Sequence, residues 1–316
     1  MRFAWTDDQC AFRDAVRDLL AKECPPSVVR AAWDAPAGDL DLGVWESLDG
    51  MGVLSVLVPE DDGGLGLDEC FLVPILEACG RAALPHPIVE TAMVAAPLGL
   101  TGVVATDLGG AIVPCAADAD VLLLRIGGAL RGYEPDQVEL TPVESVDRGR
   151  RAARVRPQGD GHLVTDDPAD VARAHDRGVL GTAAELVGLS RAMLELTVAY
   201  VTERQQFGVP IGSFQAVKHH LANALLQIEF AAPAVARAAH TLATGGAAAG
   251  RDVSMAKALA TDAADAAGRA ALQCHGAIGY TVEHDLHLFQ KRAWALARSW
   301  GTRDEHADRV AAAISV

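Results

Sequence analysis

Three long runs of apolar side chains at helical spacing fill the second half of the chain, from Val171 onward. Such stripes predict amphipathic helices that pack against one another. Their members are Leu186, Leu189, Met193, Val198 and Val201 in the first run, Val217, Leu221, Leu225 and Ile228 in the second, and Met255 and Leu259 at the start of an alanine-rich third. We therefore expect a C-terminal helical bundle.

The remaining half of the chain divides into two regions of different pattern. Residues 1–102 place Phe12 and Val16 at helix spacing, whereas residues 103–167 hold short apolar runs separated by Gly, Pro and Asp, which predict strands. At about five or six residues per strand plus turns, this middle region accommodates four or five strands. The predicted fold is mainly α with a small β insert: an N-terminal helical domain (1–102), a β domain (103–167) and a helical bundle (168–316).

Composition and charge argue against several classes of protein. Half of the 316 residues are hydrophobic, which supports a large core, but no run of 18 apolar residues predicts a membrane span. A net charge of −15 argues against nucleic acid or an anionic membrane as partner. The first residues do not resemble a signal peptide, and the six scattered cysteines are typical of reduced thiols, so we expect a cytoplasmic protein.

The segment RQQFGVPIGSFQAVKHHLA (204–222) joins the first two helical runs. Arg204 ends the first run, where a helix dipole favours a cation whatever the function. Ser213 is expected to N-cap the next helix, whose free N–H groups would lie nearby. An arginine beside a helix N-terminus can also bind a phosphate or pyrophosphate. Both interpretations remain open on spacing alone.

A second segment, ALQCHGAIGYTVEHDLHLFQKRAWALARSWGT (271–302), follows the third helical run. Gln273 is expected to project from the helix end, and Gly276 and Gly279 would let the backbone approach a ligand closely. A glycine C-cap followed by a turn would have the same pattern.

Two pairs of histidines invite a test for a metal site. His284 and His287 lie three residues apart, and His219 and His220 are adjacent on a predicted helix. Adjacent residues of a helix point to different faces, and no further ligand follows at metal spacing. We therefore predict interface or surface histidines and no metal ligand.

Both segments, with VPEDDGGLGLDE (58–69), resemble the acyl-CoA dehydrogenase family, in the family's order and over nearly the whole chain. The resemblance implies an N-terminal helical domain, a β domain and a C-terminal four-helix bundle that assembles into dimers and tetramers. It also implies α,β-desaturation of an acyl-CoA thioester, in which a carboxylate takes the α-proton and FAD receives the β-hydride.

The resemblance assigns cofactor contacts to this chain. In family members, the residues that match Arg204 and Gln273 hold the pyrophosphate and adenosine of an FAD lying in the neighbouring chain's cleft. The residues to which the resemblance carries this cross-interface role are Arg204, Gln206, Phe207, Phe214, Gln215, Gln273, Gly276 and Ala277.

The catalytic carboxylate of the family has no counterpart at either of its two known positions. One position falls on Trp300, whose indole has only an N–H donor, and the other falls on Gly178. No catalytic residue is therefore assigned. Acids occur nearby at Asp176, Glu185 and Glu195, and Glu185 is either a displaced base or part of a solvated or interface face.

The middle region is also short for the family. A full β-sandwich takes roughly 100 residues, and the family's Thr-Glu-Pro and Gly-Ser-Asp strings, which border the flavin ring, do not occur. In this the chain resembles the shortened, catalytically degenerate subunit of heterotetrameric (α2β2) steroid side-chain acyl-CoA dehydrogenases. That resemblance implies a full-length partner chain that holds the flavin ring and the base, with an FAD shared across the interface.

Two other interpretations stay open. The chain could be a self-sufficient homotetrameric dehydrogenase with a displaced base, or a non-catalytic scaffold that only binds a partner. The first predicts one FAD per chain, and the second predicts that replacing Arg204 leaves flavin binding unchanged.

Overall fold

The structure is a computed structural model that describes residues 4–108, 110 and 112–314. Its first part is helical. The elements are α1 (Asp7–Glu23), α2 (Pro26–Asp34), α3 (Gly43–Gly50) and α4 (Glu69–Arg81), with the 3-10 turns η1 (Val53–Ser55), η2 (Glu60–Asp62) and η4 (Ala96–Leu98) and the π-helical segment η3 (Val89–Ala95). A reciprocal capping box between Thr6 and Gln9 starts α1 and so satisfies two backbone N–H groups.

Short strands make up the middle region. They are β1 (Val104–Thr106), β2 (Ile112–Val113), β3 (Val121–Ile126), β4 (Ala129–Tyr133), β5 (Val138–Pro142), β6 (Ala153–Pro157) and β7 (His162–Thr165). One sheet has the order β1-β3-β4-β7, with β1 and β3 parallel, and the other has the antiparallel order β2-β6-β5. The predicted number of strands, four or five, is therefore too low for the described residues. The prediction assumed strands of five or six residues, whereas β1 and β2 are only three and two residues long.

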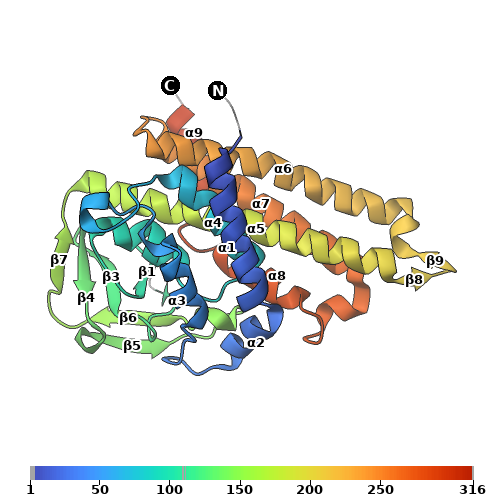
Figure 1. The fold of residues 1–316 in the computed structure, drawn as a ribbon, viewed down its shortest axis with the longest axis horizontal. Helices are drawn as coiled ribbons and strands as arrows, with labels where there is room; N and C mark the ends of the chain where they lie inside the picture. The colour runs from blue at the N-terminus through green and yellow to red at the C-terminus, as the bar shows by residue number, and fades with distance from the viewer. Residues whose placement is uncertain (1–3, 109, 111, 315–316) are drawn as a thin grey trace.

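Long helices form the C-terminal part. They are α5 (Pro168–Glu203), α6 (Gln215–Ala243) and α7 (Ala249–His275), followed by the turn η8 (Gly276–Tyr280), α8 (Leu286–Leu296) and α9 (Arg303–Ile314). Between α5 and α6 lie the hairpin strands β8 (Gln205–Gln206) and β9 (Val209–Pro210) and the turn η7 (Ile211–Ser213). The three long helices lie side by side, and α5 ends beside the hairpin at one end of the molecule (Figure 1). The predicted mainly α fold with a small β region is confirmed.

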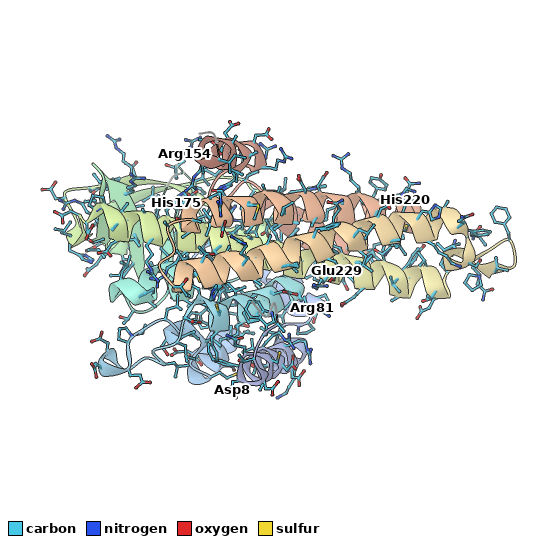
Figure 2. The ribbon with its side chains drawn as sticks, turned by 90° about the horizontal axis from the view of Figure 1, so that it is seen from above. Asp8, Arg81, Arg154, His175, His220 and Glu229 are labelled. Carbon is cyan, nitrogen blue, oxygen red and sulfur yellow. The ribbon has the colours of Figure 1, made fainter. Side chains whose placement is uncertain are left out.

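The N-terminal helices pack against one face of this long-helix layer (Figure 2). Two glycines allow the close crossing of α4 and α5. Gly80 of α4 contacts the backbone of Glu185, and Gly188 of α5 contacts the carbonyl of Glu77, so a β-carbon at either position would overlap the other helix. This crossing fixes where the side chains of α4 lie relative to those of α5.

One large apolar core runs through the helices, and a smaller one lies within the β domain. The smaller core includes Leu122, Leu124, Tyr133 and Val138. Within the described part of the chain, no helix is both long enough and apolar enough to cross a membrane.

Candidate functional site

Arg204 is the C-cap residue of α5. Its N–H donates to the carbonyl of Tyr200 at 2.9 Å, and its own carbonyl accepts from the N–H of Ile211 at 2.8 Å. The side chain is exposed, and within the described residues no carboxylate lies at ion-pair distance from it. The guanidinium is therefore available to an anion that approaches from solvent.

The hairpin after Arg204 presents an aromatic side chain to solvent. Phe207 and Gly208 form its two-residue turn with φ of 54° and 80°, which is the type I′ geometry that suits a tight hairpin. Phe207 is 93% exposed, and its ring meets that of Phe214 edge-on at 6.1 Å. An exposed, adjacent aromatic pair is an apolar surface that another chain or ligand could cover.

The expected N-cap at Ser213 is wrong. The helix begins at Gln215, with Phe214 in the cap position and no side-chain cap bond. The hydroxyl of Ser213 instead donates to the carbonyl of Pro210 at 2.7 Å, inside the turn η7. The serine is used by the connection and not by the helix, so the first N–H groups of α6 lack a side-chain cap.

The end of α7 lies beside the end of α5. Tyr200 stacks on His275 with ring centroids 4.4 Å apart, and His284 packs edge-on against His275 at 4.5 Å. Burial lowers the pKa of His275, and its Nε2 is buried without a hydrogen-bond partner among the described residues. Sequence reasoning missed this aromatic group, although Tyr200 lies four residues from Arg204 and His275 is adjacent to Gly276.

Gln273, Gly276 and Ala277 are exposed at this same end. Gly276 is the C-cap of α7 with φ 64° and ψ −138°, a conformation that favours glycine. Gln273 lines a cavity of about 430 Å³ between α6 and α7, together with His220, Asn223 and Arg269 among others. The turn predicted after the third helical run is thus present and solvent-facing.

All eight predicted cofactor contacts are therefore exposed and lie near the ends of α5 and α7 and the start of α6. The set combines an unpaired guanidinium, three amide side chains and two aromatic rings, which fits the pyrophosphate and adenosine parts of a dinucleotide. The FAD implied by the resemblance therefore fits these residues if it is presented from outside this chain.

The two positions to which the resemblance assigns the family's base lie against each other. Trp300 is 4% exposed, and a β-carbon added to Gly178 would lie 2.5 Å from its indole. His306 Nε2 donates to the carbonyl of Trp300 at 2.9 Å, and Lys257 Nζ donates to the carbonyl of Gly301 at 3.1 Å. A buried indole thus fills the space between these two positions.

Lys257 and His306 are further residues that sequence reasoning missed. Both are buried, and burial lowers the pKa of the Lys257 ammonium to about 7 and that of His306 to about 4. The signal for Lys257 was its place in the apolar stripe of MAKALATDAAD, where a charged side chain needs internal partners. Their bonds hold the loop that carries Trp300.

Glu185 does not lie on a solvated face. It is 2% exposed, and its Oε1 lies 3.6 Å from Nη2 of Arg292, whose Nη1 donates to Asp147 at 3.2 Å. Burial raises the pKa of Glu185 to about 7, against the lowering effect of Arg292, and the buried Glu90 raises it further. This cluster joins α5, α8, η3 and the β domain.

The two other acids near the base positions are paired elsewhere. Asp176 lies 3.2 Å from Arg309 and 3.7 Å from His175, while the exposed Glu195 lies 2.6 Å from Arg81. Both carboxylates are therefore engaged in ion pairs with arginine.

The histidines weighed as metal ligands make other contacts. His284 Nδ1 accepts from the N–H of Leu286 at 3.1 Å, and His287 lies 3.3 Å from a guanidinium nitrogen of Arg30. His219 and His220 are exposed on α6. Among the described residues, no group of three or more His, Cys, Asp or Glu side chains is placed to hold a metal ion.

Comparison with known proteins connects these features to one family. The family model described as acyl-CoA dehydrogenase, N-terminal domain matches residues 6–105, and the one described as acyl-CoA dehydrogenase, C-terminal domain matches residues 172–315. Among curated proteins, the chain is similar to acyl-CoA dehydrogenase IpdE2 of Mycobacterium tuberculosis, with 32% identity over 310 residues that cover 92% of each chain.

Two solved structures have the same fold. A variant of the Tcur3481-Tcur3483 steroid ACAD matches with a TM-score of 0.85 and 24% identity over 98% of each chain. The ChsE4-ChsE5 complex from Mycobacterium tuberculosis matches with a TM-score of 0.85 and 21% identity over the whole of both chains.

Proposed function

The chain belongs to the acyl-CoA dehydrogenase family, flavoprotein oxidoreductases that act on CH–CH bonds, and from this premise we propose that it completes the FAD site of a full-length partner chain. In this proposal it is one subunit of an α2β2 enzyme and is inactive alone. The division into 1–102, 103–167 and 168–316 then separates an N-terminal helical domain, a truncated β domain and a bundle for cofactor and assembly.

The buried Trp300 against Gly178 is the observation that carries the proposal. An indole that packs where a β-carbon cannot fit leaves no space for a carboxylate, and the indole itself cannot accept a proton. A chain with this arrangement needs its α-proton acceptor from elsewhere. A partner chain with an intact base would supply it.

The exposed cofactor contacts support the proposal that this chain contacts an FAD held by the partner chain. Bound FAD would supply the hydride acceptor for the α,β-desaturation. Arg204 would neutralise its pyrophosphate, the amides of Gln206 and Gln273 would donate to its polar groups, and Phe207 with Phe214 would exclude water from the junction. These side chains face solvent, so each is accessible to a cofactor held by another chain, which supports the proposal.

A bulky acyl-CoA, with a steroid side chain as the acyl group, is the substrate class we propose. The support is the short β region together with the fold shared with a steroid ACAD and a ChsE4-ChsE5 complex. The six free cysteines, all buried or partly buried, are consistent with the cytoplasm as the compartment we propose.

A self-sufficient dehydrogenase is the second candidate, and Glu185 is the observation that favours it. Its pKa of about 7 suits a general base, and it lies two helical turns beyond Gly178 on α5. Against this, Glu185 faces Arg292 in the interior and lines neither of the two cavities described for this chain.

Native mass spectrometry of the complex isolated from its own cells, with flavin counted per assembly, tests the proposal. We expect two copies of this chain, two larger chains and two FAD. Arg204→Ala should weaken FAD retention about tenfold or more, because a charge-assisted bond to the pyrophosphate is lost. Arg156→Ala is the matched control, because Arg156 is an 84% exposed arginine on β6, and it should leave FAD retention unchanged.

Two results would contradict the proposal. A homotetramer with four FAD would establish the self-sufficient enzyme and make Glu185 the residue to replace. A heteromer whose flavin content is unchanged by Arg204→Ala would show that this chain acts as a scaffold.

A further inference from the structure

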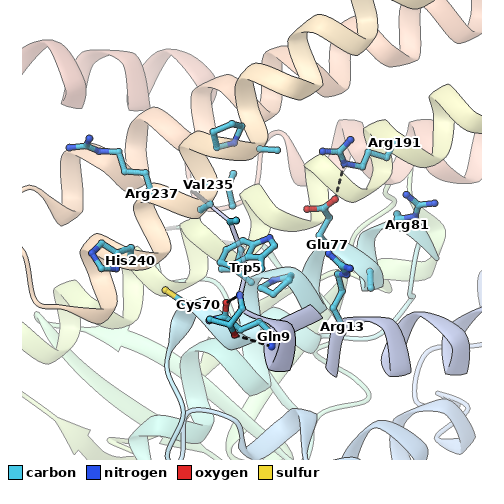
Figure 3. Close-up of a pocket in the computed structure, with 18 of the residues that line it drawn as sticks. Trp5, Gln9, Arg13, Cys70, Glu77, Arg81, Arg191, Val235, Arg237 and His240 are labelled. Carbon is cyan, nitrogen blue, oxygen red and sulfur yellow. Dashed lines mark hydrogen bonds and ion pairs between the residues drawn. The ribbon is translucent and has the colours of Figure 1, made fainter. Parts of the chain in front are cut away.

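A cavity of about 940 Å³ lies between α1, α4, α5 and α6 and is lined by none of the predicted cofactor contacts (Figure 3). Its lining on α6 starts at Glu229 and ends at His240. Glu229 follows Gln215, the first residue of α6, by about 21 Å of helix axis. The cavity is therefore separate from the cofactor contacts.

Prolines and small side chains keep this space open. Pro74 lies inside α4 and Pro233 inside α6, where each removes one backbone hydrogen bond of its helix. Ala78, Ala232 and Ala236 also face the cavity and are too small to fill it. Trp5, from the segment before α1, supplies a large apolar wall.

The other walls of the cavity are basic. Its lining includes five arginines and two glutamates, and the two glutamates, Glu77 and Glu229, both bond to one of the five, Arg191, at 2.8 and 2.7 Å. Figure 3 shows Arg191 and Glu77 joined in this way, with Arg13 and Arg81 nearby.

The remaining arginines have their carboxylate partners outside the lining. Arg13 and Arg17 pair with Asp14, Arg81 with Glu195 and Arg237 with Asp252. Each guanidinium has five N–H donors, and these pairs use only some of them, so the described lining keeps N–H donors of arginine available to a ligand. Donors of this kind suit the oxygens of a carboxylate or phosphate group.

We propose that this cavity binds an amphipathic anion, with a compact apolar body against Trp5, Pro74 and Pro233 and a carboxylate or phosphate head held by the guanidinium groups. The volume lies within the range of small-molecule sites, and guanidinium forks suit both head groups. Binding is non-covalent, because burial raises the pKa of the one thiol in the described lining, that of Cys70, to about 12.

Isothermal titration calorimetry on the full chain, alone and in its native complex, tests this site with four probes. Decanoate and decyl phosphate compare the two head groups on one body, cholate offers a ring body, and inorganic phosphate offers a head alone. We expect one saturable site per chain for an amphipathic probe, weaker binding at higher salt, and no comparable binding of inorganic phosphate.

Three variants locate the site. Arg81→Gln and Arg13→Gln should each weaken binding about tenfold, because each removes a charged donor. Ala232→Trp should abolish it by filling the cavity. Arg156→Gln is the matched control, an exposed arginine on β6 that should leave binding unchanged. Circular dichroism melts establish that each variant is folded.

Three outcomes would overturn the proposal: no saturable binding of any amphipathic probe, binding that Ala232→Trp and Arg81→Gln leave at the level of the control, or binding by the isolated chain that disappears in the native complex. The last would identify this face as an interface between chains. None of these outcomes bears on the flavin content of the complex, so the proposed function is tested separately.

Discussion

At the scale of single residues, the packing of Trp300 against Gly178 accounts for the unusual features of both residues. A glycine inside a helix costs about 1 kcal/mol relative to alanine, yet here any β-carbon would overlap a buried indole. Trp300 also adopts a φ of 58°, which non-glycine residues rarely do. Both features make sense as parts of one tightly packed contact.

Gly178→Ala is therefore expected to destabilise the chain by about 1–2 kcal/mol, because overpacking outweighs the gain in helix propensity. Urea unfolding measures the change. In a Trp300→Ala background the same substitution should be neutral or stabilising, since the indole is gone. Equal effects in both backgrounds would show that the two residues are not in contact.

The buried cluster around Glu185 makes stability depend on pH. Its folded pKa of about 7 lies above the ordinary value of 4.5, so between these values the folded chain keeps a proton that the unfolded chain has released. Stability from this group is therefore lost as pH rises from about 4.5 to about 7. His86 and His306, whose pKa burial lowers to about 4, produce the opposite slope below pH 6.5.

Glu185→Gln should remove this contribution. In the unaltered chain, Glu185 lowers the free energy of unfolding as pH rises from 5 to 7. Without it, the change in the free energy of unfolding from pH 5 to pH 7 should be more positive by on the order of 2 kcal/mol. Taking the difference cancels the histidine contributions. Glu195→Gln, in an exposed carboxylate, should leave the pH profile unchanged. An unaltered profile for Glu185→Gln would mean that Arg292 keeps the carboxylate ionised.

At the scale of elements, the β8–β9 hairpin and α6 present apolar side chains that the chain itself does not cover. Leu226 is 54% exposed, Phe230 67% and Phe207 93%. Phe207 also has a positive φ, for which a type I′ turn prefers asparagine. A bulky residue kept in a strained and exposed conformation suggests a role outside the chain's own stability.

Phe207→Asn should separate these two effects. It relieves the turn, so the isolated chain should keep its stability or gain up to about 1 kcal/mol. The loss of the exposed ring should nevertheless weaken assembly with the partner, as measured by dissociation on dilution. Val146→Ser, in another exposed apolar side chain, is the control for surface hydrophobicity. Unchanged assembly with Phe207→Asn would remove the ring from the interface.

At the scale of the whole molecule, three regions meet at one buried ion cluster. Arg292 of α8 contacts Glu185 of α5 and Asp147 of the β domain, and the buried Glu90 of η3, in the N-terminal region, interacts electrostatically with both Arg292 and Glu185. Breaking a buried pair by removing one partner typically costs about 3–5 kcal/mol. The N-terminal, β and C-terminal regions are thereby coupled, although the smaller cavity and all the predicted cofactor contacts lie in the C-terminal region.

The order of helical, strand and helical regions could be predicted from the sequence, because hydrophobic periodicity follows directly from backbone geometry. It also identified the family from three spaced motifs, and this identification is confirmed. The hydrogen-bond partners of individual side chains were harder to predict from the sequence. Ser213 could cap α6 or close the preceding turn, and only the surrounding chain geometry selected the turn.

Contacts between residues that are distant in the sequence became known only from the tertiary structure. The contact of Trp300 with Gly178, the burial of Glu185 beside Arg292 and the arginine-lined cavity beside α6 each join residues far apart in the chain. Side-chain spacing along a helix predicts which residues share a face, but it does not reveal the second element that covers that face. That choice depends on close packing of the whole core, in which glycine contacts such as those of Gly80 and Gly188 set the distance between helices.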